Sequence, residues 1–500
     1  MSLVLGLPAN PMLLVISCEL SGKTTEIAKA LLRRQLGAQS RDCVDFCQSK
    51  SLTSVELPPL RTLALRISIL SALFLTTLQA IQSVQAQDAV QPTVTAIPTQ
   101  QTAPGASYQA TETPTDSSIV QLNGREVAET PRRFHYTLQL AVRGVYDDNI
   151  NLSQTNKTSD FYTSIEPTIS LGLGGTGEDQ TNFLAFVYAP NVYIFANHSN
   201  ADAFQHVIHL AGQRQFAKLT LNAGEDIQIL DSTNLTSLTD TTGRQANIDV
   251  GQKTRVNIFN TNVGGSYDLS SKTFLSGNAQ YQVYDYPSSS LISSETVSGS
   301  LFFNYNYGAK IVVGVGGTGG YDKAEASTPD QYFEQGNLRL SYQATGKISF
   351  SATGGIEVRE FSNNARGDYI SPVYDLNATY QPFDGTTVSL TGSRTTRNSA
   401  VISGGDFTST KIDLGLRQRL LQRFSLALNG GYENDDYFSA GNGVDVSRTD
   451  NYYYFQSSID ANVTRFWTIG GYYLHRQDNS SLDNFKFSDN QVGGRTSLSF

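Results

Sequence analysis

Few residues in this chain have the types and the spacing that catalysis or metal binding requires. Five histidines occur among its 500 residues, and His206 and His209 are the closest pair. On a strand, side chains three residues apart point to opposite faces, so this pair cannot chelate one metal ion. Serine is abundant, yet no spacing places a serine beside a histidine and an orienting group, as an activated nucleophile needs. We therefore expect no catalytic residue, no cofactor and no enzymatic activity.

Two acidic runs are the other candidates for metal chemistry. Residues 146–149 (Tyr-Asp-Asp-Asn) and 433–436 (Glu-Asn-Asp-Asp) carry oxygen atoms of the kind that Ca²⁺ prefers. Neither run contains the full series of ligands found in calcium-binding loops, and solvated loops that face lipopolysaccharide explain the same composition. From the sequence we assign no metal site.

Thiol chemistry is confined to the first 47 residues. The three cysteines are Cys18, Cys43 and Cys47, so the remainder of the chain suits an oxidising compartment and has no thiolate ligand or nucleophile. Residues 21–25 (Ser-Gly-Lys-Thr-Thr) echo a phosphate-binding loop, but that pattern needs glycine at position 17, where the chain has Ser17. We therefore interpret this partial motif as a chance match and not as a nucleotide-binding site.

The N-terminal part of the chain divides into three segments of different composition. Residues 61–86 have the form of a secretory signal, with Arg61 and Arg66 ahead of a short apolar run and a small-residue cleavage site that ends at Ala86. Residues 1–60 stand ahead of a signal that normally begins a chain, and we interpret them as a misplaced gene start. Residues 87–132 are rich in Gln, Thr, Pro and Ala without periodicity, which predicts a disordered periplasmic tail.

The charge of the exported part argues against nucleic acid as a partner. Residues 1–86 hold eight of the 36 basic and five of the 45 acidic side chains, which leaves a net charge of −12 on the remainder. A surface of this sign repels polyanions.

Residues 133–500 must therefore supply the fold and the function, and their pattern is that of strands. Segments with period-two alternation follow one another, joined in turn by very short connections and by longer polar loops. We count eighteen segments, or sixteen if one hairpin is misread. The chain ends on such a segment at Phe500, as barrels do whose last strand pairs with the first. The fold class predicted is all-β: a transmembrane antiparallel up-and-down barrel with both ends on the periplasmic side.

Alternation assigns some polar side chains to the inside of this barrel. Apolar residues such as Leu138 and Leu140 would face lipid, and the charged residues between the apolar positions would line a wet lumen, because a charge on the lipid side is costly. For any one residue, a charge that only pairs across the lumen to stabilise it is at least as good an interpretation as a role in contacting substrate. The residues assigned to the lumen are Arg143, Glu357, Arg359, Arg397, Lys411, Asp413, Arg417 and Arg419.

The longest predicted loop, residues 231–252, follows the fifth strand. By analogy with general porins it would fold inward and narrow the pore. Its acidic residues would then face Arg359, Arg417 or Arg419 and set a transverse field, whereas a loop that only caps the outer surface is equally consistent with the sequence. The charged residues are Asp231, Asp240, Arg244 and Asp249.

The first predicted hairpin resembles a known family. Residues 144–150 (Gly-Val-Tyr-Asp-Asp-Asn-Ile), a short polar loop, Asp160 and a second strand are similar to the opening of the putative beta-barrel porin type 2 family, and the chain also shares the terminal aromatic residue, Phe500. The resemblance implies a Gram-negative outer-membrane barrel of porin type over about residues 133–500. It implies no catalytic residue, and some members are linked to surface polysaccharide export.

Two functions follow as expectations. The first is a water-filled channel for passive diffusion of small polar solutes. The second is the barrel of a polysaccharide or secretion export system, with periplasmic export partners docked on residues 87–132 and inward tyrosines of residues 452–454 and 472–473 stacked on sugar rings. Either barrel would meet outer-membrane lipid, lipopolysaccharide and the barrel-assembly machinery, and the sequence leaves a homo-oligomer open.

Overall fold

The structure is a computed structural model of the chain. It describes residues 134–174, 182–232, 235, 248–251, 253–325, 328–362, 366–441 and 446–500. The predicted upstream extension, signal peptide and periplasmic tail lie outside the described residues and stay predictions. Within the described ranges, no helix has the length and the apolar content needed to cross a membrane.

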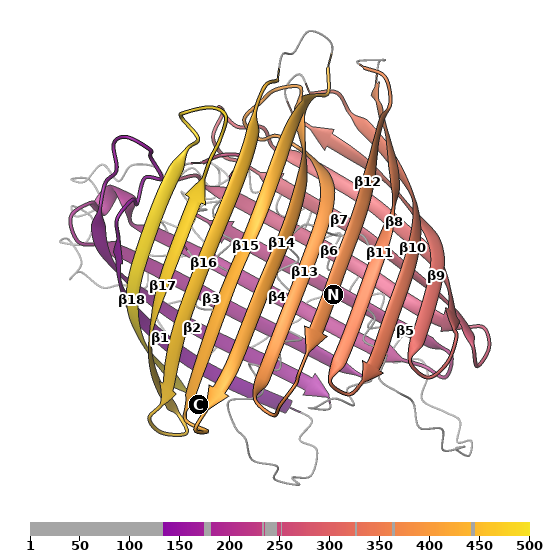
Figure 1. The fold of residues 1–500 in the computed structure, drawn as a ribbon, viewed down its shortest axis with the longest axis horizontal. Coiled ribbons are helices and arrows are strands. Elements are labelled where there is room, and N and C mark those ends of the chain that lie inside the picture. Colours follow the sequence, from indigo (N-terminus) through magenta and orange to yellow (C-terminus); the bar gives the residue numbers. More distant parts are fainter. Residues whose placement is uncertain are drawn as a thin grey trace, which may run out of the picture. The chain divides into compact units, whose positions relative to one another are not determined.

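Eighteen strands make up nearly all of the described chain, which confirms the larger of the two predicted counts (Figure 1). A short 3-10 helix, η3 (Ser199–Ala201), lies between β3 and β4. The strands are β1 (Phe134–Asp147), β2 (Asp160–Gly174), β3 (Phe183–Phe195), β4 (Ala203–Gln215), β5 (Leu219–Leu230), β6 (Val256–Asp268), β7 (Thr273–Asp285), β8 (Ser294–Asn306), β9 (Ile311–Ala324), β10 (Gln331–Thr345), β11 (Ile348–Phe361), β12 (Tyr369–Tyr380), β13 (Thr386–Asn398), β14 (Gly405–Leu420), β15 (Phe424–Ser439), β16 (Thr449–Asn462), β17 (Trp467–Asp478) and β18 (Phe487–Ser499).

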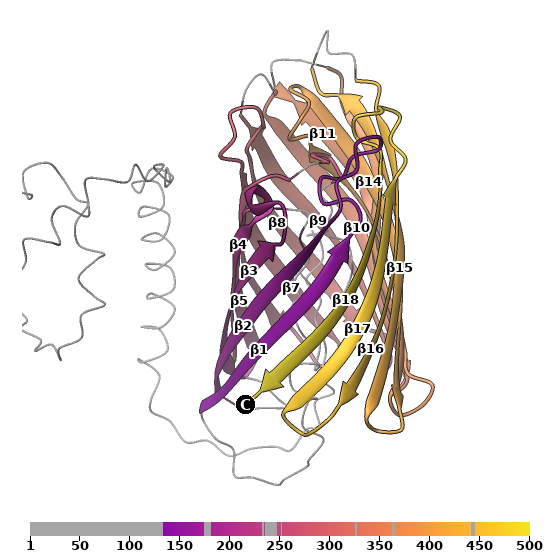
Figure 2. The same ribbon diagram turned by 90° about the vertical axis from the view of Figure 1, so that its left-hand side faces the viewer.

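The strands form one closed antiparallel sheet. Each strand pairs with its neighbours in sequence, and β1 also pairs with β18, so that no edge is left. The closing register places Arg143 opposite Arg495 and Asp147 opposite Gln491, and Figure 2 shows β1 and β18 side by side. The predicted up-and-down barrel is therefore confirmed. An unpaired edge would expose backbone groups that lipid cannot satisfy, which is why the sheet closes.

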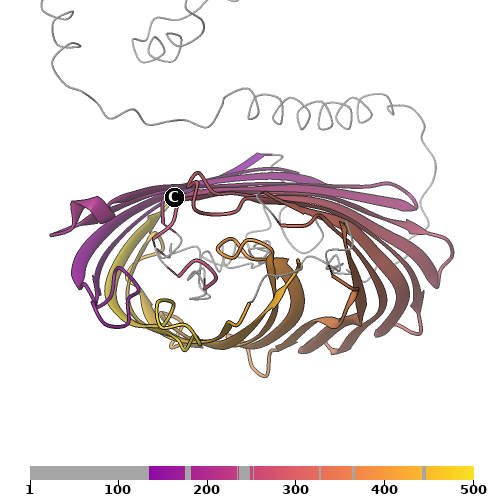
Figure 3. The same cartoon turned by 90° about the horizontal axis from the view of Figure 1, so that it is seen from above.

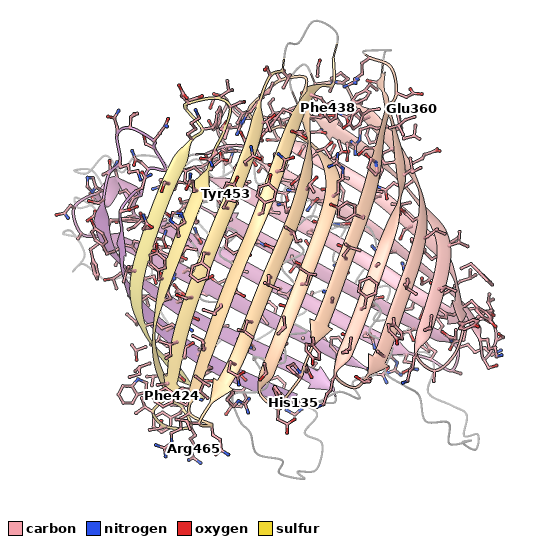
Figure 4. All side chains as sticks on the ribbon, viewed as in Figure 1. His135, Glu360, Phe424, Phe438, Tyr453 and Arg465 are labelled. Atoms are coloured by element: carbon pink, nitrogen blue, oxygen red, sulfur yellow. The ribbon has the colours of Figure 1, made fainter. Side chains whose placement is uncertain are left out.

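Alternate residues of each strand divide the barrel wall into two faces. On β1, Leu138 and Leu140 are 45% and 42% exposed, whereas Arg143 and Val145 are 3% and 0% exposed. The exposed set forms an apolar outer face. Figure 4 shows the aromatic side chain of Tyr453 on the wall, and it is exposed. A barrel that is embedded in a lipid bilayer has this pattern, with apolar residues on its outer face and polar residues on its inner face.

The two ends of the barrel differ in their connections. At one end, hereafter the turn end, β1 begins and β18 ends, and tight turns join the strands, apart from the eight-residue connection between β2 and β3. Gly385 has φ +83° in the turn before β13, a conformation that glycine adopts readily, and its carbonyl accepts the Arg419 N–H at 2.7 Å. At the other end, hereafter the loop end, longer connections join the strands, as the sequence predicts.

Buried apolar residues gather at the loop end instead of forming one central core. Three clusters there each include a residue of the connection between β5 and β6, namely Leu235, Ile248 and Val250. This connection, residues 231–255, is hereafter the β5–β6 loop. The structure describes Leu235 and residues 248–251 of its interior, besides its two ends.

Candidate functional site

The inner face of the barrel is lined by charged groups that pair along the wall. Arg143 of β1 lies 2.5 Å from Glu166 Oε1 through Nη2, and its Nε donates to the same oxygen at 2.6 Å. Its Nε also donates to Ser164 Oγ at 3.1 Å, and its Nη1 donates to the Tyr472 hydroxyl at 3.3 Å. Both partners of the ion pair are 3% exposed. Tyr472 reaches Arg143 because Gly493 stands beneath its ring, where a Cβ would lie 2.5 Å from the ring.

The structure places Glu357 and Arg359 together on β11. Arg359 Nε lies 3.1 Å from Glu357 Oε1, and its Nη1 pairs with Asp322 and donates to Gln331 at 2.7 Å. Arg359 is 2% exposed. This arginine therefore belongs to a closed network within the wall near the loop end.

Lys411 and Asp413 of β14 also have partners on neighbouring strands. Lys411 Nζ lies 2.6 Å from Glu433 Oε1. Asp413 Oδ1 accepts the Tyr454 hydroxyl at 2.7 Å. Arg397 is half-buried on β13, opposite Phe407 in the register.

Arg417 and Arg419 lie toward the turn end of β14 and are both exposed. The described loop acids Asp231 and Asp249 have other partners, given below. Because Asp240 lies outside the described residues, the expectation that loop acids face Arg359, Arg417 or Arg419 stays a prediction.

The β5–β6 loop meets the opposite wall through Asp249. Eight strands lie between β6 and β15 whichever way round the ring is followed, yet Asp249 Oδ1 accepts the Tyr437 hydroxyl of β15 at 3.1 Å. The same carboxylate accepts Ser399 Oγ at 2.8 Å and the Ala400 N–H at 2.6 Å, both from the connection between β13 and β14. Asp249 therefore lies against the side of the ring opposite β6, at the loop end.

Arg448, which precedes β16, also binds this segment of the loop. Its Nη1 donates to the Asp249 carbonyl at 2.9 Å and its Nη2 to the Ile248 carbonyl at 2.8 Å. Its Nη2 also lies 2.6 Å from Asp450 Oδ2. The guanidinium is thus shared between the loop backbone and a carboxylate of β16. Arg448, Tyr437 and Ser399 are functional candidates that the sequence did not single out, since nothing local marks them.

Apolar contacts support the same docking. Ile248 packs with Leu152, Tyr452, Tyr454 and Phe487. Val250 packs in a second cluster with Val256, Tyr286 and Ala400. Figure 3, seen from above, shows connecting segments that lie inside the ring of strands. Burial of apolar side chains on both sides of Asp249 removes water from its polar contacts and strengthens them.

Burial raises the pKa of the Asp249 carboxyl above its ordinary value, and the nearby Arg448 guanidinium and the three hydrogen-bond donors oppose that shift. The docked carboxyl therefore binds a proton more tightly than a solvated aspartate.

The remaining predicted loop residues have other positions. Asp231 lies at the base of the loop, where its Oδ1 is 3.5 Å from Arg255 Nε and its Oδ2 accepts the Phe204 N–H at 3.0 Å. Asp240 and Arg244 lie outside the described residues.

The inward tyrosines are packed instead of being presented to the lumen. Tyr452, Tyr454 and Tyr472 are 1%, 6% and 8% exposed. The first two are covered by Ile248 of the loop. Because these rings are buried against other side chains, they are not exposed for sugar rings to stack on, as the second expected function required.

The two histidines of the closest pair lie on opposite faces of β4 and have separate partners. His206 Nδ1 is 3.0 Å from the Tyr188 hydroxyl, and His209 Nδ1 is 2.5 Å from Asp226 Oδ1. Each is held by a residue of a neighbouring strand.

Phe500 closes the barrel at the turn end. Its N–H donates to the Leu138 carbonyl at 2.8 Å, and its carbonyl accepts the Leu138 N–H at 3.0 Å. The ring stays 70% exposed beside Phe466. Backbone pairing and an exposed aromatic ring at the rim are therefore separate properties of this residue.

A closed barrel of eighteen antiparallel strands with an apolar outside and a charged inside defines the class of outer-membrane porin-like barrels. Residues 331–498 match the family described as Putative beta-barrel porin 2. The match spans β10 to β18 and confirms the family resemblance, over a different part of the chain from the hairpin that suggested it.

Solved structures with a similar arrangement include Pseudomonas aeruginosa OccK2 (OpdF), at 12% identity and TM-score 0.40, with 73% of this chain and 98% of that chain covered. Pseudomonas aeruginosa OpdK with vanillate has 12% identity and TM-score 0.38, covering 73% and 99%. Acinetobacter baumannii OccAB3 has 11% identity and TM-score 0.37, with 73% of this chain and 99% of that chain covered. A comparison with curated proteins finds no match.

Proposed function

We propose that this protein is an outer-membrane channel through which small polar solutes diffuse passively, and that the β5–β6 loop narrows its outer mouth. The observation that carries the proposal is the docking of Asp249 on Tyr437, Ser399 and Arg448 across the ring. A loop held on the opposite wall narrows the lumen without filling the whole barrel.

The barrel itself supports a wet passage. Barrels of sixteen to eighteen strands are wide enough to leave an aqueous channel. The inner face carries charged pairs such as Arg143 with Glu166 and Lys411 with Glu433, and the exposed Arg417 and Arg419 add positive charge toward the turn end. Such a wall favours hydrated solutes over apolar ones.

The proposal includes the route to the membrane. The protein would be exported to the outer membrane of a Gram-negative bacterium, with cleavage after Ala86, and Phe500 would be read by the barrel-assembly machinery. Outer-membrane lipid and lipopolysaccharide would surround the apolar face.

Liposome swelling tests the proposal. The full barrel is reconstituted into liposomes, which are then diluted into isosmotic sugars of increasing size. We expect swelling that falls steeply above one solute size, as a passive channel with a fixed constriction produces. Liposomes that do not swell in any sugar, with folding verified by heat-modifiable migration on gels, would overturn the channel.

A further inference from the structure

Three aspartates meet at the loop end of the seam that closes the barrel. Asp147 and Asp148 come from the end of β1, and Asp489 comes from β18. One carboxylate oxygen of each lies within 4.8 Å of the others. Calcium binds oxygen at about 2.3–2.6 Å, so two of its ligands can stand at most about 5 Å apart. The three oxygens therefore satisfy the distance limit for a single ion.

One of these carboxylates has an acceptor that nothing in the described chain satisfies. Asp489 is 0% exposed. Its Oδ2 accepts Arg476 Nε at 2.8 Å and Nη2 at 2.5 Å, whereas its Oδ1 is buried without a hydrogen-bond partner among the described residues. A buried carboxylate oxygen that lacks a partner is costly. A cation at this oxygen would remove that cost.

The other two carboxylates are held in place by hydrogen bonds that leave lone pairs available. Asp147 accepts the Asn149 N–H at 2.8 Å and Gln491 Nε2 at 3.0 Å. Asp148 accepts the Asn490 N–H at 2.8 Å and Asn490 Nδ2 at 2.7 Å. Each ionised carboxylate has about four lone-pair sites, so one donor on each oxygen does not prevent binding of a metal.

The charges of the cluster are not balanced by protein groups. Among the described ion pairs, one involves a carboxylate of this cluster, and it joins Arg476 to Asp489. The two nearby lysines bond to backbone carbonyls: Lys157 to Ser488 at 2.7 Å, and Lys253 to Asn200 at 3.0 Å. With all three carboxylates ionised, one guanidinium leaves two negative charges, which a divalent cation would neutralise.

A small cavity adjoins the cluster. It is lined by Asp147, Asn149 and Arg476 among others and has a volume of about 10 Å³, close to the space that one bound water needs. A calcium ion takes six to eight oxygen ligands in a flexible arrangement and completes its shell with water. The cavity offers a place for such a water.

We propose that Asp147, Asp148 and Asp489 bind a divalent cation of the calcium type that ties the loop ends of β1 and β18 together. At the turn end the same seam is held by the backbone pairing of Phe500 with Leu138. The cation would secure the opposite end, where Asp148 N–H donates to the Asn490 carbonyl at 3.1 Å. The proposal concerns stability and does not depend on what passes through the lumen.

Thermal unfolding with and without calcium tests the site. The full barrel is refolded into detergent without lipopolysaccharide, so that lipid-bound calcium does not contribute, and is melted in EDTA and in increasing CaCl₂. We expect the melting temperature to rise by a few degrees once calcium exceeds its dissociation constant about 100-fold. Equilibrium dialysis with radioactive calcium should give about one bound ion per chain.

Variants separate a site from a general effect of calcium. Asp489→Asn and the milder Asp148→Asn should each remove the calcium-dependent shift and the bound ion. Asp435→Asn is the matched control, because Asp435 is also a buried inner-face aspartate and pairs in the register with Asp450; it should keep both. Equal melting of the wild type in EDTA and calcium, or a shift that persists in both seam variants, would overturn the proposal. Loss of the shift in Asp435→Asn as well would also contradict it.

Discussion

Arg448 Nη1 donates to the carbonyl of Asp249 at 2.9 Å, although 199 residues separate the two in the chain. Their segments belong to opposite sides of the ring of strands. The contact holds residues 248–251 of the β5–β6 loop against the far side of the ring, and this segment is hereafter called the strap. In the proposed channel the strap would narrow the passage, and single substitutions should weaken its attachment.

Acidification should strengthen the attachment of the strap. Because the pKa of docked Asp249 is raised above the ordinary aspartate value of 3.8, the docked state binds a proton more tightly than the undocked state. By linkage, this contribution to docking is fully present below pH 3.8 and is lost as the pH rises through the raised pKa. We expect channel conductance to fall as the pH is lowered toward the ordinary aspartate value.

Asp249→Asn tests the assignment of this pH dependence. The amide does not titrate, so bilayer recordings of this variant should show a flatter dependence on pH than the wild type. An unchanged pH profile in Asp249→Asn would show that another group is responsible, and a wild-type conductance that rises with acid would contradict the sign.

The buried pair Arg143–Glu166 should be a main determinant of barrel stability. Arg143→Met leaves Glu166 buried without its cation, which costs about 3–5 kcal/mol. Urea unfolding of the refolded barrel should show that loss, and the double variant Arg143→Met/Glu166→Gln should recover part of it. Arg419→Met is the control: this exposed arginine should change stability by less than about 0.5 kcal/mol. Equal losses in Arg143→Met and Arg419→Met would refute the role of the buried pair.

Phe500→Ala should separate barrel closure from recognition during assembly. The substitution keeps both backbone bonds to Leu138 and removes a ring that is 70% exposed, so the folded barrel should lose less than about 1 kcal/mol in urea unfolding. The amount of assembled barrel in outer membranes should nevertheless fall. Phe383→Ala removes another exposed ring at the turn end, 73% exposed, and should assemble normally. If the two variants assemble alike, the ring of Phe500 is not the signal.

The strand content was predictable because the relevant signal is local. Alternation of Leu138 and Leu140 with polar neighbours shows up within a few residues, and a barrel wall repeats that pattern eighteen times. The closing contact of Phe500 follows from its position at the end of the last strand. The placement of Arg143, Glu357 and Arg359 on the inner face follows from the same alternation.

The partners of these residues were not predictable, because they depend on the three-dimensional path of the loops. Asp249 was singled out as a residue of the long loop, but its partner Arg448 stands 199 positions away and no pattern links them. The aspartate cluster is similar: Asp147 and Asp148 were noted as an acidic run, and Asp489 joins them only through the register of the closing strands. The register of β1 and β18 can be read along the two strands only when Phe500 is known to pair with Leu138.

The single-channel conductance of Asp249→Ala against the wild type tests the central claim most directly. The substitution removes the carboxylate that accepts hydrogen bonds from Tyr437, Ser399 and Ala400 and leaves Arg448 its backbone acceptors, so the attachment of the loop to the opposite wall should weaken. Asp231→Ala serves as the control, since Asp231 bonds at the base of the loop, to Arg255 and Phe204. In planar bilayers under identical salt, we predict a larger conductance step for Asp249→Ala and an unchanged step for Asp231→Ala. Steps of equal size in the wild type and Asp249→Ala would contradict a channel narrowed by this loop.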